Sequence, residues 1–375
     1  MRILHFKNKV IWAVILIAVF LSVDCFAQQT PQSGIDAENM IPYIPEDIYK
    51  DLPSDFFTSE ATDLLSSGSG EIFRNAISKY FRAGIGKAWP VVAELFAILI
   101  SASVFGAIHQ TDNECSKVVD FALTASVSVL LYHCSFEVYQ SIQLFLEQLH
   151  CFVSGTMGLQ IGLYLSQGNS ITAATISASS SILLTVIETV SEKILLPIFV
   201  VCFGFSLVMC FSELFDFSGI VKSIRNALYL LMGFVATIGG AIMLYQQKIA
   251  LSADSLAAKS IKFASAGFIP LVGSALGDAT RAVMASVSLI KNTVGAIGII
   301  IIIFLLLSPI LLILIYRVIF WGASLMASAF GLKRQNAMIG ECCAILDIAV
   351  AVVCFSATVF LFVFALLIQS GAACV

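Results

Sequence analysis

The sequence predicts an all-α, polytopic membrane helix bundle with roughly seven to eight transmembrane spans and a short extracytoplasmic N-terminal arm. Hydrophobic residues make up 59% of the chain and charged residues only 12%, against roughly 25% charged residues in soluble domains. The mean hydropathy is +0.97. The apolar residues recur in runs of about 20, the length that a helix needs to cross a bilayer. Such a chain lacks the polar surface that a soluble globule requires.

Composition and motifs also exclude several classes of function. The net charge is −4 and there is no basic run, so we expect no nucleic-acid partner. Neither a phosphate-binding loop nor a nucleophile elbow occurs, so we expect no enzyme activity, no catalytic residue and no cofactor. Three histidines lie near cysteines, but adjacent helix positions point apart and a metal needs three or four converging ligands, so we expect no metal. These pairs are His109 with Cys115, His133 with Cys134 and His150 with Cys151.

The N-terminal residues 1–27 are typical of a signal peptide. A basic stretch precedes an apolar run at 10–23, and the small residues Cys25 and Ala27 form a cleavage site. An uncleaved membrane anchor is the alternative. In both cases we expect the following residues to lie outside the cytoplasm.

Residues 28–70 predict an acidic extracytoplasmic arm. The segment from 36 to 63 holds eight carboxylates against one basic residue, Lys50, and the arm contains four of the eight prolines. It is too short and polar to own a core, so we expect an extended arm that becomes ordered on a partner's surface, with one short helix around 59–65. Residues 71–88 have apolar positions at helical spacing, which predicts an amphipathic interfacial helix.

Residues 89–375 form the predicted polytopic membrane domain. We expect spans at 89–109, at 118–136, twice within 148–187, at 194–212, at 226–247, at 294–316 and at 348–369. Residues 137–148 are predicted to be a polar connection, and the shorter segment 318–330 to be interfacial. With the N-terminus outside and eight spans, the positive-inside rule places these basic residues in the cytoplasm: Lys117, Lys222, Arg225, Arg317, Lys333 and Arg334.

Residues 259–292 form the most unusual membrane segment, because an apolar stretch here carries five charged side chains and a proline between two glycines. Ionisable groups within a membrane usually face a bundle interior or a cavity. An amphipathic helix pair with its lysines among the headgroups is the alternative to an element that lines a pathway. The residues of this predicted pathway or assembly element are Lys259, Lys262, Phe268, Pro270, Gly273, Gly277, Asp278, Arg281, Lys291 and Asn292.

The same stretch carries a family signature. The motif Lys-x-x-Lys-Phe at 259–263 is followed by Phe-Ile-Pro-x-Val-Gly at 268–273, Asp-Ala at 278–279 and Ser-Leu-Ile-Lys-Asn-x-Val-Gly at 288–295. In this order the motifs resemble the stage III sporulation protein AE family, and a weaker resemblance extends from about Gly84 to the C-terminus.

The resemblance implies a setting and a function. Members of the family lie in the mother-cell membrane that surrounds the forespore, where we expect the N-terminal arm to face the intermembrane space. They belong to a secretion-like channel complex, or feeding apparatus, required for endospore development. The implied partners are other stage III sporulation membrane proteins, a cytoplasmic secretion-type ATPase, a forespore-side membrane protein and membrane lipid. An autonomous small-solute transporter is the alternative function, and interrupted helices in both halves of the chain would favour it.

Overall fold

The computed structural model describes residues 37–50, 69–108, 114–166, 169–211, 218–266 and 273–369, and these residues contain no β-strand. The all-α fold class is therefore confirmed. The elements are η1 (Ala37–Tyr43), α2 (Glu46–Tyr49), α4 (Ser69–Ile108), α5 (Glu114–Ser166), α6 (Ser170–Val190), η3 (Ser191–Leu195), α7 (Leu196–Phe211), α8 (Ser218–Ala266), α9 (Gly273–Ala329) and α10 (Lys333–Gln369). Residues 1–27, predicted to be a signal peptide, lie outside these ranges, so that prediction stays untested.

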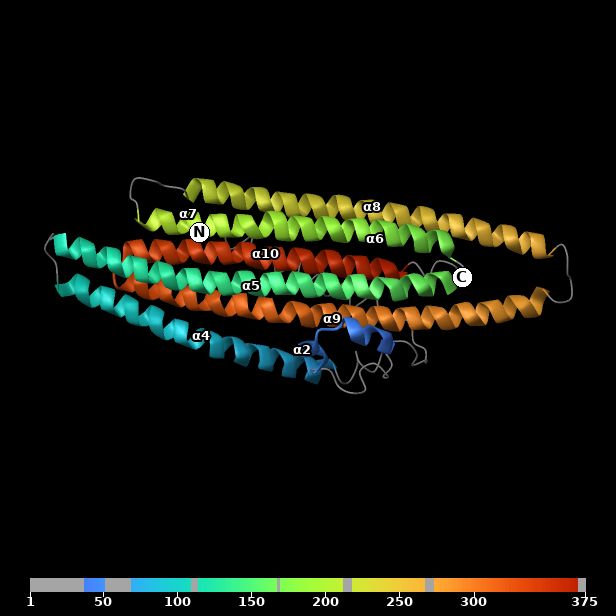
Figure 1. Cartoon of the computed structure of the whole chain (residues 1–375), viewed down its shortest axis with the longest axis horizontal. Coiled ribbons are helices and arrows are strands. Elements are labelled where there is room, and N and C mark those ends of the chain that lie inside the picture. Colours follow the sequence, from blue (N-terminus) through green and yellow to red (C-terminus); the bar gives the residue numbers. More distant parts are fainter. Residues whose placement is uncertain are drawn as a thin grey trace.

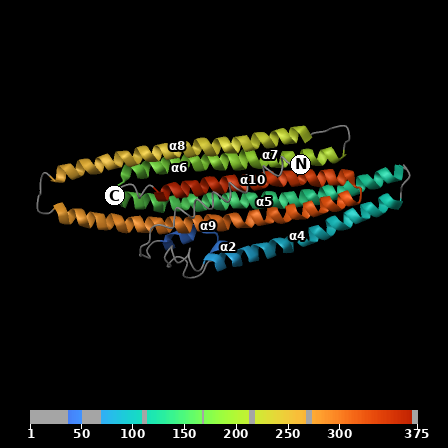
Figure 2. The same ribbon diagram turned by 180° about the vertical axis from the view of Figure 1, so that it is seen from behind.

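The long helices run up and down along one common axis (Figures 1 and 2). The central helix is α10, which contacts α9, α5, α7 and α8. In an apolar 18-residue stretch within Lys333–Ala365 of α10, 61% of the residues are buried inside the bundle, against 17% in the corresponding stretch within Gly219–Leu256 of α8. Thus α10 forms the core, and α8 lies at the periphery.

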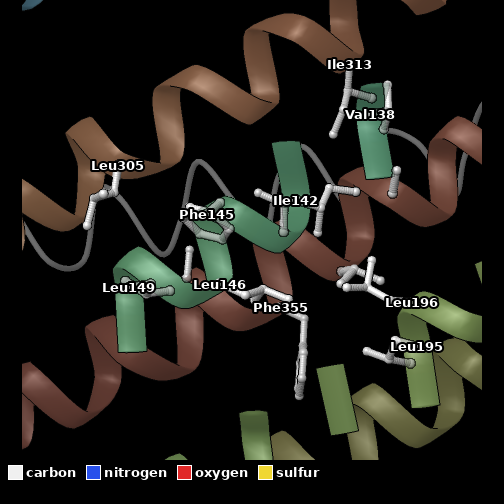
Figure 3. Packing of buried hydrophobic residues seen from close by; sticks show 14 of the residues in the cluster. Val138, Ile142, Phe145, Leu146, Leu149, Leu195, Leu196, Leu305, Ile313 and Phe355 are labelled. Atoms are coloured by element: carbon white, nitrogen blue, oxygen red, sulfur yellow. The ribbon is translucent and has the colours of Figure 1, made fainter. Parts of the chain in front are cut away.

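The core is built from aliphatic and aromatic side chains that recur at helical spacing. In Figure 3, Ile142, Phe145 and Leu149 of α5 lie between α9 and α10. Figure 3 also shows Leu196 and Phe355 close to this layer, so α7 and α10 share the same apolar interior.

Six of the described helical segments are long and apolar enough to cross a membrane, whereas the sequence predicted seven or eight spans. Two pairs of predicted spans are joined. The spans 118–136 and 148–166 form one helix, α5, and the predicted polar connection 137–148 is helical. This connection contains neither glycine nor proline, and Glu, Gln and Leu are good helix formers, so its polarity does not end the helix.

The second pair of spans is joined by α6, η3 and α7, which follow one another without a break. The turn η3 is π-helical, so its backbone hydrogen bonds join residues five apart instead of four. It contains the charged residues Glu192 and Lys193. Because both pairs merge, six long apolar segments stand where eight spans were predicted, and the side of the membrane that each basic segment faces stays a prediction.

The N-terminal part of the chain is also more continuous than the sequence predicted. The amphipathic segment 71–88 and the first span are parts of one helix, α4, which passes through Pro90. Residues 37–50 of the arm are packed against the bundle without a partner protein. The element η1 contacts α5 and α9, and α2 contacts α9. Met40, Ile44 and Ile48 are buried in the core. The predicted helix around 59–65 lies outside the described residues.

Candidate functional site

The predicted element at 259–292 lies where α8 ends and α9 begins. Lys259 and Lys262 belong to the last turns of α8. The first turns of α9 contain Gly273, Gly277, Asp278, Arg281, Lys291 and Asn292. Phe268 and Pro270 lie outside the described residues. At this end of the bundle, α8 and α9 extend beyond the neighbouring helices (Figure 1). The role of the element in a pathway or in assembly stays a prediction.

A first polar cluster joins α5 to α10, and the side chain of Asp120 in it is 49% exposed. Arg334 Nη1 lies 3.3 Å from Asp120 Oδ2, and Gln335 Nε2 donates to Asp120 Oδ1 at 3.1 Å. The same nitrogen lies 3.1 Å from Thr124 Oγ1, and Gln335 and Thr124 are both buried. A buried polar group needs a partner, so these contacts fix the register of α10 on α5.

A glycine turn between α9 and α10 brings this cluster together. Gly331 has φ +74°, a left-handed conformation that glycine adopts without steric cost. Gly331 N–H donates to Ser328 O at 3.1 Å and Leu332 N–H donates to Ala327 O at 2.9 Å, the two bonds of a Schellman motif. The turn folds α10 back along α9, and Ser324 Oγ donates to Asn336 Oδ1 at 2.6 Å.

A second set of polar residues, which we call the charged belt, comprises Glu137, Tyr316, Arg317 and Asp347. The hydroxyl of the buried Tyr316 donates to Glu137 Oε2. Arg317 Nη1 lies 2.7 Å from Asp347 Oδ1. The belt crosses α5, α9 and α10 at one level of the bundle, and it places an ion pair between the two most apolar helices.

Two further contacts tie α6 to its neighbours. Asp254 of α8 accepts hydrogen bonds from the backbone N–H groups of Ile171 at 3.1 Å and Thr172 at 2.7 Å. A carboxylate at this position accepts hydrogen bonds from N–H groups that have no partner within the helix. Its negative charge is also stabilised by the positive N-terminal end of the helix dipole. His150 Nδ1 of α5 lies 3.5 Å from Glu188 Oε2 of α6.

These contacts join neighbouring helices of the bundle. Within the part of the chain that the structure describes, no three His, Cys, Asp or Glu side chains gather as a metal site. Each of the carboxylates described above forms a hydrogen bond or an ion pair with a residue on another helix. The arrangement can hold long helices in a fixed register, and it places ionisable groups inside an apolar bundle.

Sequence reasoning missed these pairs. It placed Arg317 and Arg334 in the cytoplasm, outside the predicted spans, and paired neither of them with a carboxylate. One signal was available, because Arg317 and Asp347 are nearly equidistant along the chain from Gly331. In an antiparallel helix hairpin such residues reach the same level, since both helices rise equally per residue.

Comparisons with known proteins agree with the signature at 259–295. A family model described as Stage III sporulation protein AE matches residues 60–371. Stage III sporulation protein AE of Bacillus subtilis (strain 168) is 24% identical over 217 residues, covering 56% of this chain and 54% of that relative. The match thus spans about half of the relative's length. No solved structure matches the chain. Because the family model covers most of its length, the chain belongs to the stage III sporulation protein AE family.

Proposed function

We propose that this chain is a non-enzymatic integral membrane component of the channel complex that links the mother cell to the forespore. Its place in this proposal is the mother-cell membrane around the forespore, with the N-terminal arm in the intermembrane space. Its partners are other stage III sporulation membrane proteins, a cytoplasmic secretion-type ATPase and a forespore-side membrane protein. The observation that carries the proposal is the family match over residues 60–371.

The polar contacts of the bundle support a non-enzymatic role. Asp120, Glu137, Asp254 and Asp347 all engage a neighbouring helix. A catalytic acid or base needs a free position that faces a substrate, whereas these carboxylates hold helices together. The geometry therefore suits a structural or conducting part of an assembly.

One observation favours the alternative, a transporter that acts alone. The π-helical turn η3 carries Glu192 and Lys193 near the middle of the chain, and interrupted helices are a feature of secondary transporters. The second irregular region would be the predicted element at 259–292.

Affinity purification from sporulating cells in mild detergent separates the two functions. For the tagged full-length chain we expect several stage III sporulation membrane proteins to co-purify, and the ATPase to be retained after gentle crosslinking. A chain that purifies only as a homo-oligomer, and that catalyses solute uptake into liposomes, would establish the transporter instead. The tagged chain expressed in vegetative cells is the control for non-specific capture.

A further inference from the structure

An arginine of α8 lies at the same level of the bundle as an aspartate of α10. A methyl group added to Gly240 of α8 would lie 3.3 Å from the ring of Phe362 of α10, which gives the register of the two helices. Both helices run in the same direction (Figure 1), and helices rise equally per residue. Arg225 precedes Gly240 by 15 residues and Asp347 precedes Phe362 by 15, so these two charges face the same layer.

The helix α9 brings a second arginine to this aspartate. Arg317 Nη1 lies 2.7 Å from Asp347 Oδ1. The positive charge of Arg225 also acts on Asp347. The charges of both arginines act on the hydroxyl of Tyr229, which follows Arg225 by one helical turn. The register and the electrostatic interactions therefore agree that Arg225, Tyr229, Arg317 and Asp347 lie together, and we call them the arginine cluster.

The arginine cluster holds more positive than negative charge, because it contains two guanidinium groups and one carboxylate. Asp347 forms its ion pair with Arg317. Arg225 forms neither an ion pair nor a hydrogen bond with the residues that the structure describes. An arginine keeps its charge in proteins, and a partly buried charge without a counter-ion costs free energy. An additional negative charge beside Arg225 would therefore be favourable.

The unpaired groups of the arginine cluster are hydrogen-bond donors. A guanidinium group carries five N–H donors and no acceptor. The side chains of Arg225 and Tyr229 are partly buried, and the Tyr229 hydroxyl forms no hydrogen bond with the described part of the chain. Lys222, one turn before Arg225, is exposed and adds another positive charge nearby. Such a set of donors fits an anion that has several oxygen atoms.

The arginine cluster is also accessible from outside the bundle. The side chains of Arg317 and Asp347 are 28% and 18% exposed. On the same face of α10 as Asp347, Ala344 and Ala351 are partly exposed, and a Cβ atom at the exposed Gly340 would meet nothing within 4 Å. This face of α10 is therefore only partly covered by the other helices, and a small group can reach the donors.

A purely structural alternative is that Arg225 and Arg317 share Asp347. One carboxylate can accept hydrogen bonds from two arginines. Among the described residues, however, the ion pair of Asp347 is with Arg317. Sharing would also leave the Tyr229 hydroxyl without an acceptor. A bound anion accounts for both unpaired groups, whereas sharing accounts for one.

We propose that Arg225, Tyr229 and Arg317 bind a phosphate group. The planar guanidinium groups match the oxygen atoms of a phosphate with paired N–H donors, and the Tyr229 hydroxyl donates to a further oxygen. The phosphate belongs either to the headgroup of an anionic lipid or to inorganic phosphate, and both present the same chemistry. This site does not depend on the proposed function.

Isothermal titration calorimetry with the purified full chain tests the proposal. The chain is kept in a maltoside detergent, which carries no phosphate, and titration into protein-free micelles gives the background heat. The two probes are short-chain phosphatidylglycerol and inorganic phosphate, both at an ionic strength held constant with sodium chloride. We expect saturable binding of at least one probe. The probe that binds more tightly identifies the source of the phosphate group.

Substitutions within the arginine cluster assign the binding to it. Arg225→Gln removes the charge and the donors, so the Kd of the tighter probe should rise by at least about tenfold. Arg225→Lys keeps the charge but loses the planar fork, so its Kd should rise less. Tyr229→Phe removes only the hydroxyl and should raise the Kd by about threefold to tenfold. Arg82→Gln, at an exposed arginine of α4, is the matched control and should change the Kd by less than about twofold.

Two results would overturn the proposal. One is the absence of saturable binding of both probes to the unaltered chain. The other is an equal Kd for Arg225→Gln and Arg82→Gln, which would show that any basic surface of the protein binds the probe. Tyr229→Phe keeps the ring and its packing, so weaker binding by this variant cannot come from a lost fold. A helical far-UV spectrum for each variant excludes unfolding as the cause.

Discussion

The ion pair between Arg317 and Asp347 should contribute measurably to the stability of the bundle. Arg317 Nη1 lies 2.7 Å from Asp347 Oδ1, and the side chains are only 28% and 18% exposed. At this distance and an effective dielectric constant of about 20, the Coulomb attraction is about 6 kcal/mol, much of which desolvation offsets.

Removing one partner leaves the other charge uncompensated. That costs about 3–5 kcal/mol for a buried pair and about 0–1 kcal/mol for an exposed one. Because the side chains are mostly but not fully enclosed, we expect Asp347→Asn and Arg317→Gln each to lower the free energy of unfolding by about 2–3 kcal/mol. The double variant should lose no more than the larger single loss, so the coupling energy should exceed about 1 kcal/mol.

Unfolding of the full chain by SDS in mixed micelles, followed by circular dichroism, measures these free energies. Glu94→Gln is the matched control, since Glu94 is exposed on α4, and we expect a change within about 0.5 kcal/mol. Single losses no larger than that of the control, or an additive double variant, would refute the ion pair as a stabilising contact between α9 and α10.

Three further predictions concern the arm, the glycine turn and the predicted element at 259–292. In Gly155→Ala the added methyl group meets the ring of Tyr43, so limited proteolysis should cut the arm faster, and adding Tyr43→Ala should restore protection; unchanged cleavage of the single variant would contradict the docking. Gly331→Ala places a residue with a side chain at φ +74° and should lower the free energy of unfolding in SDS by about 1–2 kcal/mol. An unchanged free energy of unfolding would show that the turn relaxes. Asp278→Asn should abolish sporulation while the protein still reaches the membrane, whereas Lys248→Gln should not; normal spore counts with Asp278→Asn would leave only the interfacial alternative for the element.

The sequence by itself determined the fold class and the family. A chain with 59% hydrophobic and 12% charged residues has too little polar surface for a soluble globule, and apolar runs of about 20 residues predict membrane-length helices. The order of short motifs at 259–295 identified the family, because such a signature depends on the residues alone. Helix breaks were harder to place. Polar residues at 137–148 lower hydropathy without ending a helix, so two spans that look separate in the sequence form α5.

Only the tertiary structure decided which residues meet and which face outwards. The contact of Asp120 with Arg334 and Gln335 depends on the register that the turn at Gly331 sets between distant helices. Local sequence does not encode that register. Likewise, the run 294–316 would be equally apolar in lipid and in a protein core, so hydropathy cannot distinguish the two. The difference lies in the helices that surround the run, and their outer faces are fixed only when the whole bundle has packed.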